Sequence, residues 1–387
     1  VPLLSRLMSP YFSLKDNISN ILSVDYLGAL IATLLFPFLL LPFLGIFKTS
    51  LFFGLVNMSI GFAVLWFFSE TLKLEKKRIL YLYSFFSLSL LIAVFIFAQK
   101  LLSIWTGELY SDRVIYAKET PYQQIVMTKN KKDLRLFLNG NLQFSSIDEY
   151  RYHESLVHVP MLNCDCRNIL LLGGGDGLAV RELLKYPAIE SMTLVDLDPE
   201  VTQLAQHNRQ LKKLNQASLN DAKVTLYNED AFVYLSKNSQ PYDLIIIDLP
   251  DPNNTSLSRL YSKEFYHLVK RNLRPQGRFV TQATSPYYAK QAFWSINNTI
   301  TAAGFTSVLP YHVNVPSFGE WGFILASRQS LALKPYQPSI TTQFVDSNAI
   351  ERMFSFDKDM LASNVDISTL DSPKILDYYL SGWNHWK

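Results

Sequence analysis

The stretch that decides the fold is NILLLGGGDGLAVRELL, residues 168–184. Its apolar run at 169–172 is typical of a buried parallel strand. The glycines that follow allow the backbone to turn sharply and to approach a ligand closely. Residues 178–184 have helical spacing, and Pro187 stops the helix soon after. The stretch therefore predicts the first strand, turn and helix of a nucleotide-binding sheet.

The same alternation of strand and helix continues along the chain. We predict strands at 192–195, 223–227 and 242–247, with a helix at 201–211. Each strand is followed by an aspartate, and parallel strands end at the edge of the sheet where ligands bind. About twenty residues after the glycines is also where such folds carry the carboxylate that binds a ribose. The carboxylates expected at this edge are Asp176, Asp196, Asp230 and Asp248.

The first hundred residues have a different character. Segments 26–47, 49–69 and 79–99 carry no charged residue, and each is long enough to cross a hydrocarbon core of ~30 Å. We predict three transmembrane helices, with the first kinked at Pro37 and Pro42. No positively charged start with a cleavage site precedes them, so we do not expect a signal peptide. Three buried helices of a soluble bundle are the alternative.

The remaining chain predicts a small antiparallel β domain followed by an α/β domain and an extension. The fold class expected is thus α/β, a Rossmann-like sheet of the class I methyltransferase type behind a small β domain and transmembrane helices. We expect the C-terminal extension to serve packing more than chemistry. The predicted boundaries are 1–105 for the membrane region, 106–147 for the β domain, 148–330 for the catalytic domain and 331–387 for the extension. Within them we expect strands at 114–117, 123–128, 134–138, 278–282, 306–313 and 321–326, and helices at 148–159, 263–271 and 287–303.

Two arguments about membrane orientation disagree. The basic loop 73–78 should lie in the cytoplasm, and one further crossing would place the rest of the chain outside. The substrates of a nucleotide-type site are cytosolic, however. We give the substrate argument more weight and expect a multi-pass protein of the cell membrane, in contact with the lipid bilayer, with a cytoplasmic catalytic domain.

Composition limits the possible partners. The 36 Lys plus Arg nearly balance the 33 Asp plus Glu, so we expect no nucleic-acid partner. The only cysteines, Cys164 and Cys166, offer too few ligands for a metal site, and we interpret them as free thiols. A homo-oligomer is possible.

Taken together, the motifs resemble those of the spermidine synthase family, the polyamine aminopropyltransferases. The similarity covers roughly residues 107 to 330, and the hydrophobic beginning resembles the membrane-anchored bacterial branch. The residues that carry it are the Gly173–Gly177 turn, Asp196, Asp230, the Asp248-x-x-Asp251-Pro252 motif, Tyr122-Gln123, and Asp148-Glu149-x-x-Tyr152-His153-Glu154.

The resemblance implies transfer of an aminopropyl group from decarboxylated S-adenosylmethionine to putrescine, giving spermidine and methylthioadenosine. Decarboxylated S-adenosylmethionine is a co-substrate, and no further cofactor is implied. Asp248 would accept the proton. The polyamine would lie along Tyr152, His153, Asp176 and Asp251, and the nucleoside would be held by Gln123, Gly173, Gly175, Asp196, Asp230 and Ala231.

Elementary chemistry agrees with these roles. An alkylamine has a pKa of ~10, so it must lose a proton before it attacks carbon. A neighbouring carboxylate can accept that proton, and further carboxylates attract a dication. Asp176 would also repel the carboxylate of ordinary S-adenosylmethionine in a confined site.

Other interpretations remain open. An S-adenosylmethionine-dependent methyltransferase would use the same sheet and the same nucleoside carboxylates, and a membrane protein could sense a nucleoside or polyamine without turnover. Asp248 could merely cap a strand end, and His153 could merely bond to backbone. The chain also departs from the family pattern at Leu249-Pro250, at Asn253-Asn254-Thr255 and at Phe318, where a tyrosine is often found.

Overall fold

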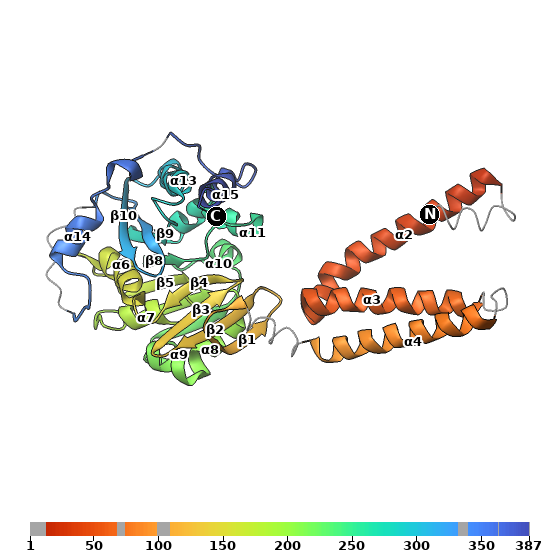
Figure 1. The fold of residues 1–387 in the computed structure, drawn as a ribbon. Coiled ribbons are helices and arrows are strands. Elements are labelled where there is room, and N and C mark those ends of the chain that lie inside the picture. The colour runs from red at the N-terminus through yellow and green to blue at the C-terminus, as the bar shows by residue number, and fades with distance from the viewer. Residues whose placement is uncertain (1–12, 68–73, 99–108, 332–339, 363, 387) are drawn as a thin grey trace. The chain divides into compact units, whose positions relative to one another are not determined.

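The computed structural model describes residues 13–67, 74–98, 109–331, 340–362 and 364–386 (Figure 1). The chain forms two compact units, Val1–Gln124 and Ile125–Lys387. The finer division into four domains stays a prediction.

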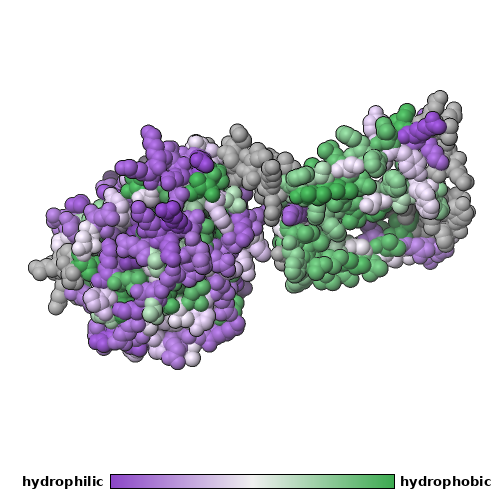
Figure 2. All heavy atoms as spheres, turned by 90° about the horizontal axis from the view of Figure 1, so that it is seen from below, coloured by the Kyte–Doolittle hydropathy of each residue, from purple (hydrophilic) through white to green (hydrophobic). Residues whose placement is uncertain are grey.

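The described part of the first unit contains long apolar helices. They are α2 (Leu14–Leu35), α3 (Leu41–Phe67) and α4 (Leu74–Ile96). Three stretches are long and apolar enough to cross a membrane, Ile18–Leu40, Phe47–Phe67 and Lys76–Ile96. Figure 2 shows the surface of this unit covered largely by apolar side chains. The first of these stretches begins earlier than the predicted segment 26–47. Its helix continues through the charged residue Asp25, whereas the predicted segment included only uncharged residues.

The kink predicted near the end of the first segment is present. A π-helical turn, Phe36–Leu40, begins with proline at its first positions, and Gly45 interrupts α3 with a φ of 70°. Only glycine adopts such a φ without strain. The hydroxyl of Thr49 donates to the Leu40 carbonyl (3.2 Å) and so satisfies a backbone group near the break.

A small antiparallel arrangement of strands follows. Strand β1 (Arg113–Glu119) belongs to the first unit, whereas β2 (Gln124–Asn130), β3 (Asp133–Leu138) and β4 (Asn141–Ser145) pair in sequence order. The sequence had not predicted β4. The turn that precedes it is Asn139-Gly140, with both residues at positive φ, which is the usual chemistry of a tight hairpin.

The second unit is built on a seven-stranded sheet with the order β10-β11-β9-β8-β5-β6-β7. Strands β9, β8, β5, β6 and β7 run parallel, and β10 and β11 close the edge as the predicted antiparallel pair. The strands are β5 (Asn168–Gly173), β6 (Ser191–Asp196), β7 (Val224–Asn228), β8 (Tyr242–Asp248), β9 (Leu273–Gln282), β10 (Ser307–Val315) and β11 (Gly319–Ser327).

Helices cover this sheet, which explains the continuous apolar runs of its central strands (Figure 1). Residues 169–172 of β5 and 244–247 of β8 are fully buried. The helices are α6 (Glu149–Met161), α7 (Leu178–Leu183), α8 (Pro199–His207), α9 (Arg209–Leu214), α10 (Ala231–Lys237), α11 (Thr255–Ser258), α12 (Lys263–Arg271), α13 (Lys290–Ala302), α14 (Ser347–Met353) and α15 (Lys374–Asn384).

Two local predictions were wrong. The helix expected over 201–211 is divided at Asn208, because the Asn208 side chain accepts from the N–H groups of Gln210 (3.0 Å) and Leu211 (3.2 Å) and begins a new helix. The cysteines are not free thiols, since Cys164 and Cys166 form a disulfide. The turn after α6, with Asn163 at a φ of 53°, brings the two sulfur atoms together.

The turn after β5 depends on glycine. Gly173 has a φ of 81°, and a Cβ atom there would overlap the carbonyl oxygen of Asp248. Gly140 has a similar φ of 78°, but nothing lies within 4 Å of its added Cβ. A comparison of substitutions at the two positions therefore separates the cost of backbone strain at positive φ from the cost of steric overlap.

We predict that Gly173→Ala lowers the free energy of unfolding by more than about 3 kcal/mol, because strain and overlap combine. Gly140→Ala, the matched control, should cost only about 1 kcal/mol. Thermal and urea unfolding of both variants measure the difference. Equal losses would show that β5 and β8 do not approach each other as described.

Candidate active site

Asp248 lies at the end of β8, where its carboxyl group accepts a hydrogen bond and interacts with nearby charged side chains. The Tyr152 hydroxyl of α6 donates to its Oδ1 atom at 2.6 Å. A Cβ atom on Gly174 would lie 3.4 Å from Oδ2, so the glycine turn leaves room for this carboxyl group. Burial raises the pKa of Asp248 to about 6; the charge of His153 opposes that rise and the nearby Asp176 adds to it.

Asp176 shares this site. It is buried, its Oδ1 accepts from the Leu178 N–H at 2.9 Å, and Asn215 holds its backbone carbonyl at 2.8 Å. Burial raises the pKa of Asp176, while the charge of His153 lowers it. Asp176 belongs to the glycine turn, and Oδ2 of Asp248 lies against Gly174 of the same turn. The charge of Asp176 also adds to the rise in the pKa of Asp248.

The positive charge of His153 acts on both carboxylates. Burial lowers its pKa, but the hydrogen bond from Nδ1 to the Glu149 carboxylate (2.8 Å), with the charges of Glu149, Asp176 and Asp248, raises it to about 9. Glu149 is itself held by two hydrogen bonds from Arg181, at 2.8 and 3.0 Å. Nδ1 of His153 also forms a hydrogen bond with the backbone carbonyl of Glu149 (2.9 Å). Such a bond to backbone is the alternative role that the sequence left open for this residue. Both interpretations of His153 are therefore compatible with the structure.

Asp251 follows in the same loop and is surrounded by neutral donors. Nε2 of Gln282 lies 3.3 Å from its Oδ1, and the Thr284 hydroxyl lies 3.4 Å from its Oδ2. Burial raises the pKa of Asp251 to about 6, although Tyr379 of α15, Gln282 and Thr284 each lower it. Gln282 in addition donates to the Leu249 carbonyl at 2.7 Å, which fixes the loop between the paired aspartates.

Asp196, at the end of β6, lies against the glycine turn. Its oxygens accept from the N–H groups of Gly175 and Asp198, each at 3.0 Å. A Cβ atom on Gly175 would lie 2.5 Å from Asp196 Oδ2, so this approach requires glycine. Burial raises the pKa of Asp196 to about 6, although both backbone hydrogen bonds lower it. A carboxylate has further lone pairs, so Asp196 can still accept from a ligand hydroxyl.

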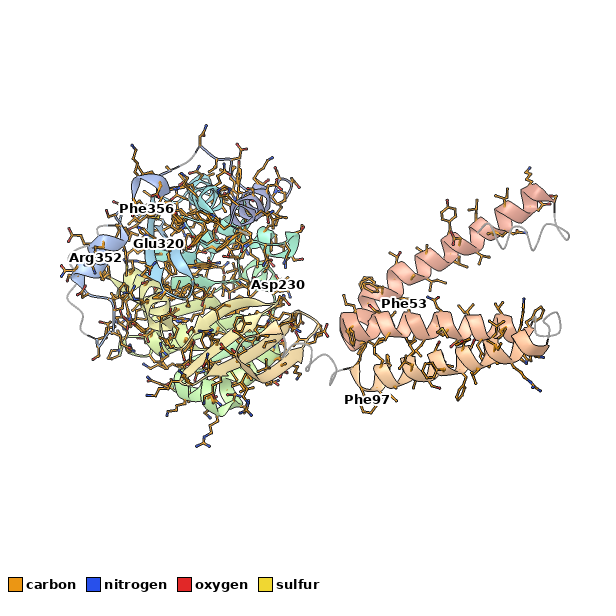
Figure 3. The ribbon with its side chains drawn as sticks, in the orientation of Figure 1. Phe53, Phe97, Asp230, Glu320, Arg352 and Phe356 are labelled. Atoms are coloured by element: carbon orange, nitrogen blue, oxygen red, sulfur yellow. A yellow bond between two sulfur atoms is a disulfide. The ribbon has the colours of Figure 1, made fainter. Side chains whose placement is uncertain are left out.

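Asp230 makes two structural interactions that the sequence did not predict. Its Oδ1 caps α10 by accepting from the Val233 N–H (3.1 Å), and its Oδ2 forms an ion pair with Arg259. Figure 3 labels Asp230 among the side chains of this unit. Ala231, beside it, is buried as the first residue of α10. Gln123 lies in the first unit, where its N–H donates to the Thr120 hydroxyl at 3.0 Å. A role for these predicted residues in nucleoside binding stays a prediction.

The hairpin between β10 and β11 is tied to the start of α6. Ser317 donates to the Asp148 carboxylate from its N–H (2.6 Å) and from its hydroxyl (2.8 Å). Next to it, the ring of Phe318 lies 6.2 Å from the ring of Tyr152 and 5.3 Å from the ring of Trp321, centroid to centroid. An aromatic surface thus adjoins Tyr152 where the family pattern would place a tyrosine hydroxyl.

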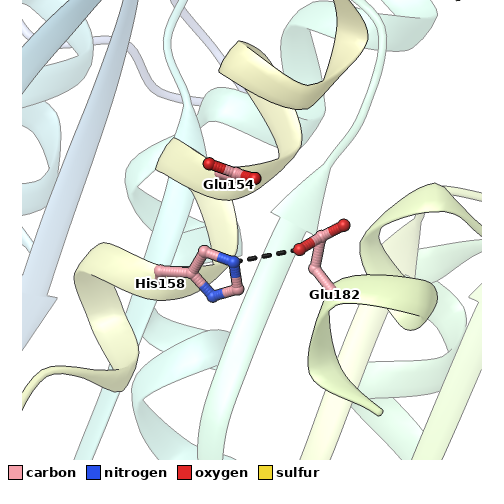
Figure 4. Close-up of side chains that lie close together, drawn as sticks. All are labelled: Glu154, His158 and Glu182. Atoms are coloured by element: carbon pink, nitrogen blue, oxygen red, sulfur yellow. Dashed lines mark hydrogen bonds and ion pairs between the residues drawn. The ribbon is translucent and has the colours of Figure 1, made fainter. Parts of the chain in front are cut away.

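A second group of polar side chains, Glu154, His158 and Glu182, has the geometry of metal ligands (Figure 4). The oxygen and nitrogen atoms that would bind a metal ion already form hydrogen bonds within the protein, however. Glu154 accepts from the backbone N–H groups of 343–345 at 2.7 to 2.9 Å, and His158 bonds to Glu182 at 3.0 Å. Lys185 adds a positive charge 2.5 Å from Glu182. We therefore assign this group to packing, where it joins α6 to the C-terminal extension.

Sequence reasoning missed Gln282, Thr284 and Tyr379. Gln282 and Thr284 end the predicted strand 278–282 or follow it directly, so position at the edge of the sheet could have indicated them. Tyr379 lies more than a hundred residues beyond Asp251, in a segment we expected only to pack. No local pattern indicates its partner.

Comparison with known proteins agrees with this geometry. Residues 149–336 match the family model described as the spermine/spermidine synthase domain. The polyamine aminopropyltransferase of Leptospira interrogans is 42% identical over 387 residues, which covers 99% of this chain and 76% of that protein. The polyamine aminopropyltransferase of Oceanobacillus iheyensis is 40% identical, covering 97% of this chain and 73% of that protein.

Solved structures show the same fold. A spermidine synthase in complex with the transition state analogue AdoDATO superposes with a TM-score of 0.58 at 26% identity, covering 63% of this chain and 86% of the other. The spermidine synthase of Thermotoga maritima gives 0.57 at 25% identity, covering 63% and 85%. The chain belongs to the spermine/spermidine synthase family, whose members are polyamine aminopropyltransferases, and the predicted Rossmann-like fold is confirmed.

The buried cation gives a direct test. We predict that the His153 imidazole titrates near pH 9 in the free protein and that Glu149→Gln lowers its pKa by more than about one unit, because a hydrogen-bonded charge is lost. NMR titration of the imidazole measures both values. Glu190→Gln, which removes an exposed carboxylate, should leave the titration unchanged. A pKa of 6.5 or lower in the unaltered protein would contradict the proposed balance of charge.

Proposed function

We propose that this chain transfers the aminopropyl group of decarboxylated S-adenosylmethionine to putrescine, giving spermidine and methylthioadenosine. The single observation that carries the proposal is the position of Asp248 at the carboxyl edge of the sheet, where it accepts a hydrogen bond from Tyr152 and lies against the glycine turn that contains Asp176. Family membership supports the same reaction class.

The nucleoside would lie along the glycine turn. Gly173 and Gly175 have no side chains, so a ligand can approach their backbone, and Asp196 would accept hydrogen bonds from the ribose hydroxyls. Asp230 and Ala231 at the start of α10 would contact the base. Gln123, in the first unit, stays a prediction from the sequence for the same ligand. No cofactor is needed, because the sulfonium of the co-substrate already makes its neighbouring carbon electrophilic.

Asp248 would act as the general base. Its pKa of about 6 leaves it ionised at neutral pH and brings it closer to the operating pH than an ordinary aspartate, which favours proton transfer. The hydrogen bond from Tyr152 fixes Oδ1, so the amine proton would go to Oδ2, on the side of the glycine turn. The free electron pair on nitrogen then attacks the carbon next to sulfur, and methylthioadenosine leaves.

The diamine would be held by charge. Asp176 and Asp251 would each offer a carboxylate to an ammonium group of the diamine, and Tyr152 and His153 would lie beside it. The positive charge of His153 offsets part of the carboxylate repulsion when no amine is bound. Asp176 would also repel the carboxylate of S-adenosylmethionine, which favours the decarboxylated co-substrate.

We further propose that the protein is a multi-pass protein of the cell membrane and belongs to the membrane-anchored bacterial branch of the family. The three long apolar helices support insertion in a lipid bilayer. The catalytic unit would lie on the cytoplasmic side, where both substrates are found, and it could form homo-oligomers.

We predict that Asp248→Asn lowers kcat at least a hundredfold while nucleoside binding is retained, because general-base catalysis typically contributes about 10² to 10⁴. Turnover is followed as methylthioadenosine formed only when putrescine is present, and nucleoside binding is measured by calorimetry. Asp165→Asn, which removes an exposed carboxylate, is the control. S-adenosylhomocysteine formed from S-adenosylmethionine would instead indicate a methyltransferase, and no sulfur product would indicate a sensor.

The amine site should also depend on pH. Asp248 and Asp251 have pKa values of about 6, so both are largely protonated at pH 5 and ionised at pH 7. A dicationic amine binds the ionised form, so its affinity should rise by about tenfold or more between pH 5 and pH 7 and then level off. Calorimetry in two buffers should detect proton release near pH 6. An affinity that does not change over this range would contradict the proposal.

A further inference from the structure

Two neighbouring residues of the stretch 168–184, Arg181 and Glu182, have no role in the proposed reaction. They lie on α7, the helix that follows the glycine turn, and both side chains are buried. A buried charge is costly unless it is paired and hydrogen-bonded. The partners of these two side chains therefore indicate what the charges hold in place.

The guanidinium of Arg181 lies between two carboxylates. Its Nη1 and Nη2 atoms donate to the two oxygens of Glu149, at 2.8 and 3.0 Å, and its Nε donates to Oε1 of Glu182 at 2.9 Å. Nη1 also donates to the Leu214 carbonyl at 3.1 Å. Two parallel hydrogen bonds from one planar group fix the plane of the Glu149 carboxylate, which the point charge of a lysine cannot do.

The second oxygen of Glu182 is held as well. Its Oε2 bonds to Nε2 of His158 at 3.0 Å and pairs with Nζ of Lys185 at 2.5 Å (Figure 4). Nδ1 of His158 bonds in turn to the Tyr186 hydroxyl at 3.0 Å. Because His158 belongs to α6 and Glu182 to α7, the network joins the two helices and restrains the carboxylate that holds Arg181.

Glu149 connects this network to the amine site. Its Oε2, which accepts from Arg181, also hydrogen-bonds Nδ1 of His153 at 2.8 Å. The His153 ring lies 5.1 Å from the Tyr152 ring, centroid to centroid, and the Tyr152 hydroxyl donates to Asp248 at 2.6 Å. The orientation of the His153 ring beside the proposed general base therefore depends on the Glu149 carboxylate.

We propose that Arg181 is a positioning residue for the amine substrate, which fixes the His153 imidazole through the Glu149 carboxylate while Glu182 orients the guanidinium. The inference rests on the proposed function, in which His153 lies beside the diamine. A ring that could rotate freely would have to be ordered when the diamine binds, and that ordering weakens binding. A network that merely joins α6 to α7 would have no such effect on the amine.

Arg181→Lys tests the proposal, because it keeps the positive charge but loses the two parallel bonds that orient Glu149. We expect the KM for putrescine to rise about tenfold, with kcat within about threefold and nucleoside affinity unchanged. The proton on Nδ1 of His153, followed by NMR, should exchange faster with solvent because its acceptor is less ordered. An unchanged KM would overturn the proposal.

Two other arginines serve as controls. Arg278 is also buried, and its guanidinium donates to the Leu162 carbonyl at 2.8 Å, just after the end of α6. Arg278→Lys should lower the thermal stability but leave the KM for putrescine unchanged. Arg167→Lys changes an exposed ion pair and should alter neither. A rise in KM with Arg278→Lys as large as that with Arg181→Lys would show that lost packing is the cause, which would overturn the proposal.

A double-mutant cycle with Glu149→Gln shows whether Arg181 acts through this carboxylate. In the Glu149→Gln background, Arg181→Lys should have no further effect on the KM for putrescine. An equal effect in both backgrounds would contradict the proposed route.

If Arg181→Lys does not fold, Glu182→Gln decides the question. The KM for putrescine should then rise about threefold, because a neutral acceptor holds the guanidinium less firmly, and an unchanged KM would count against the proposal. If the unaltered protein makes no spermidine, the proposed function fails instead. The exchange of the His153 proton still shows in that case whether Arg181 fixes the imidazole, so the two failures are distinguishable.

Discussion

The interaction on which the site depends is the repulsion between carboxylates that share one edge of a sheet, offset by a buried cation. Asp176 and Asp248 interact with each other, and burial raises the pKa of both. His153 remains charged beside them because Glu149, held by Arg181, stabilises the imidazolium. A dicationic substrate would complete the neutralisation of charge, which links substrate binding to the electrostatics of these side chains.

The backbone makes this arrangement possible. Gly173 allows β5 to pass close to the end of β8, and Gly175 allows the chain to touch Asp196. A side chain at either position would displace a carboxylate or the strand that carries it. The same turn therefore sets the fold and places acidic groups of two proposed subsites, those for the nucleoside and for the amine, on neighbouring strands.

The sheet and its acidic edge could be predicted from sequence because both depend on local patterns. An apolar run followed by glycines predicts β5 and its turn, and an aspartate after each strand predicts the ligand edge. Charge-free segments likewise predict the apolar helices. Two features depend on single side chains or turns that these patterns do not describe. The helix break at Asn208 depends on one capping side chain, and the disulfide lies at the turn of Asn163.

Within the site, the sequence indicated Asp176, Asp248 and Asp251 but not how they are held. The contacts of Gln282 and Thr284 with Asp251 join segments 31 and 33 residues apart, and no periodicity reveals them. Glu154 shows the converse, since it matches a family motif yet binds backbone N–H groups of the extension. The extension is therefore part of the architecture around the site and not merely an appendage.

The most direct test of the central claim is a crystal structure of the full chain with methylthioadenosine and putrescine bound to its catalytic unit. The account predicts one amine nitrogen within about 3.2 Å of the Asp248 carboxylate, facing the sulfur of the nucleoside. It also predicts that Asp176 and Asp248 contact the same diamine. An amine nitrogen that lies away from Asp248, or a diamine on a different face of the sheet from Asp176, would contradict it.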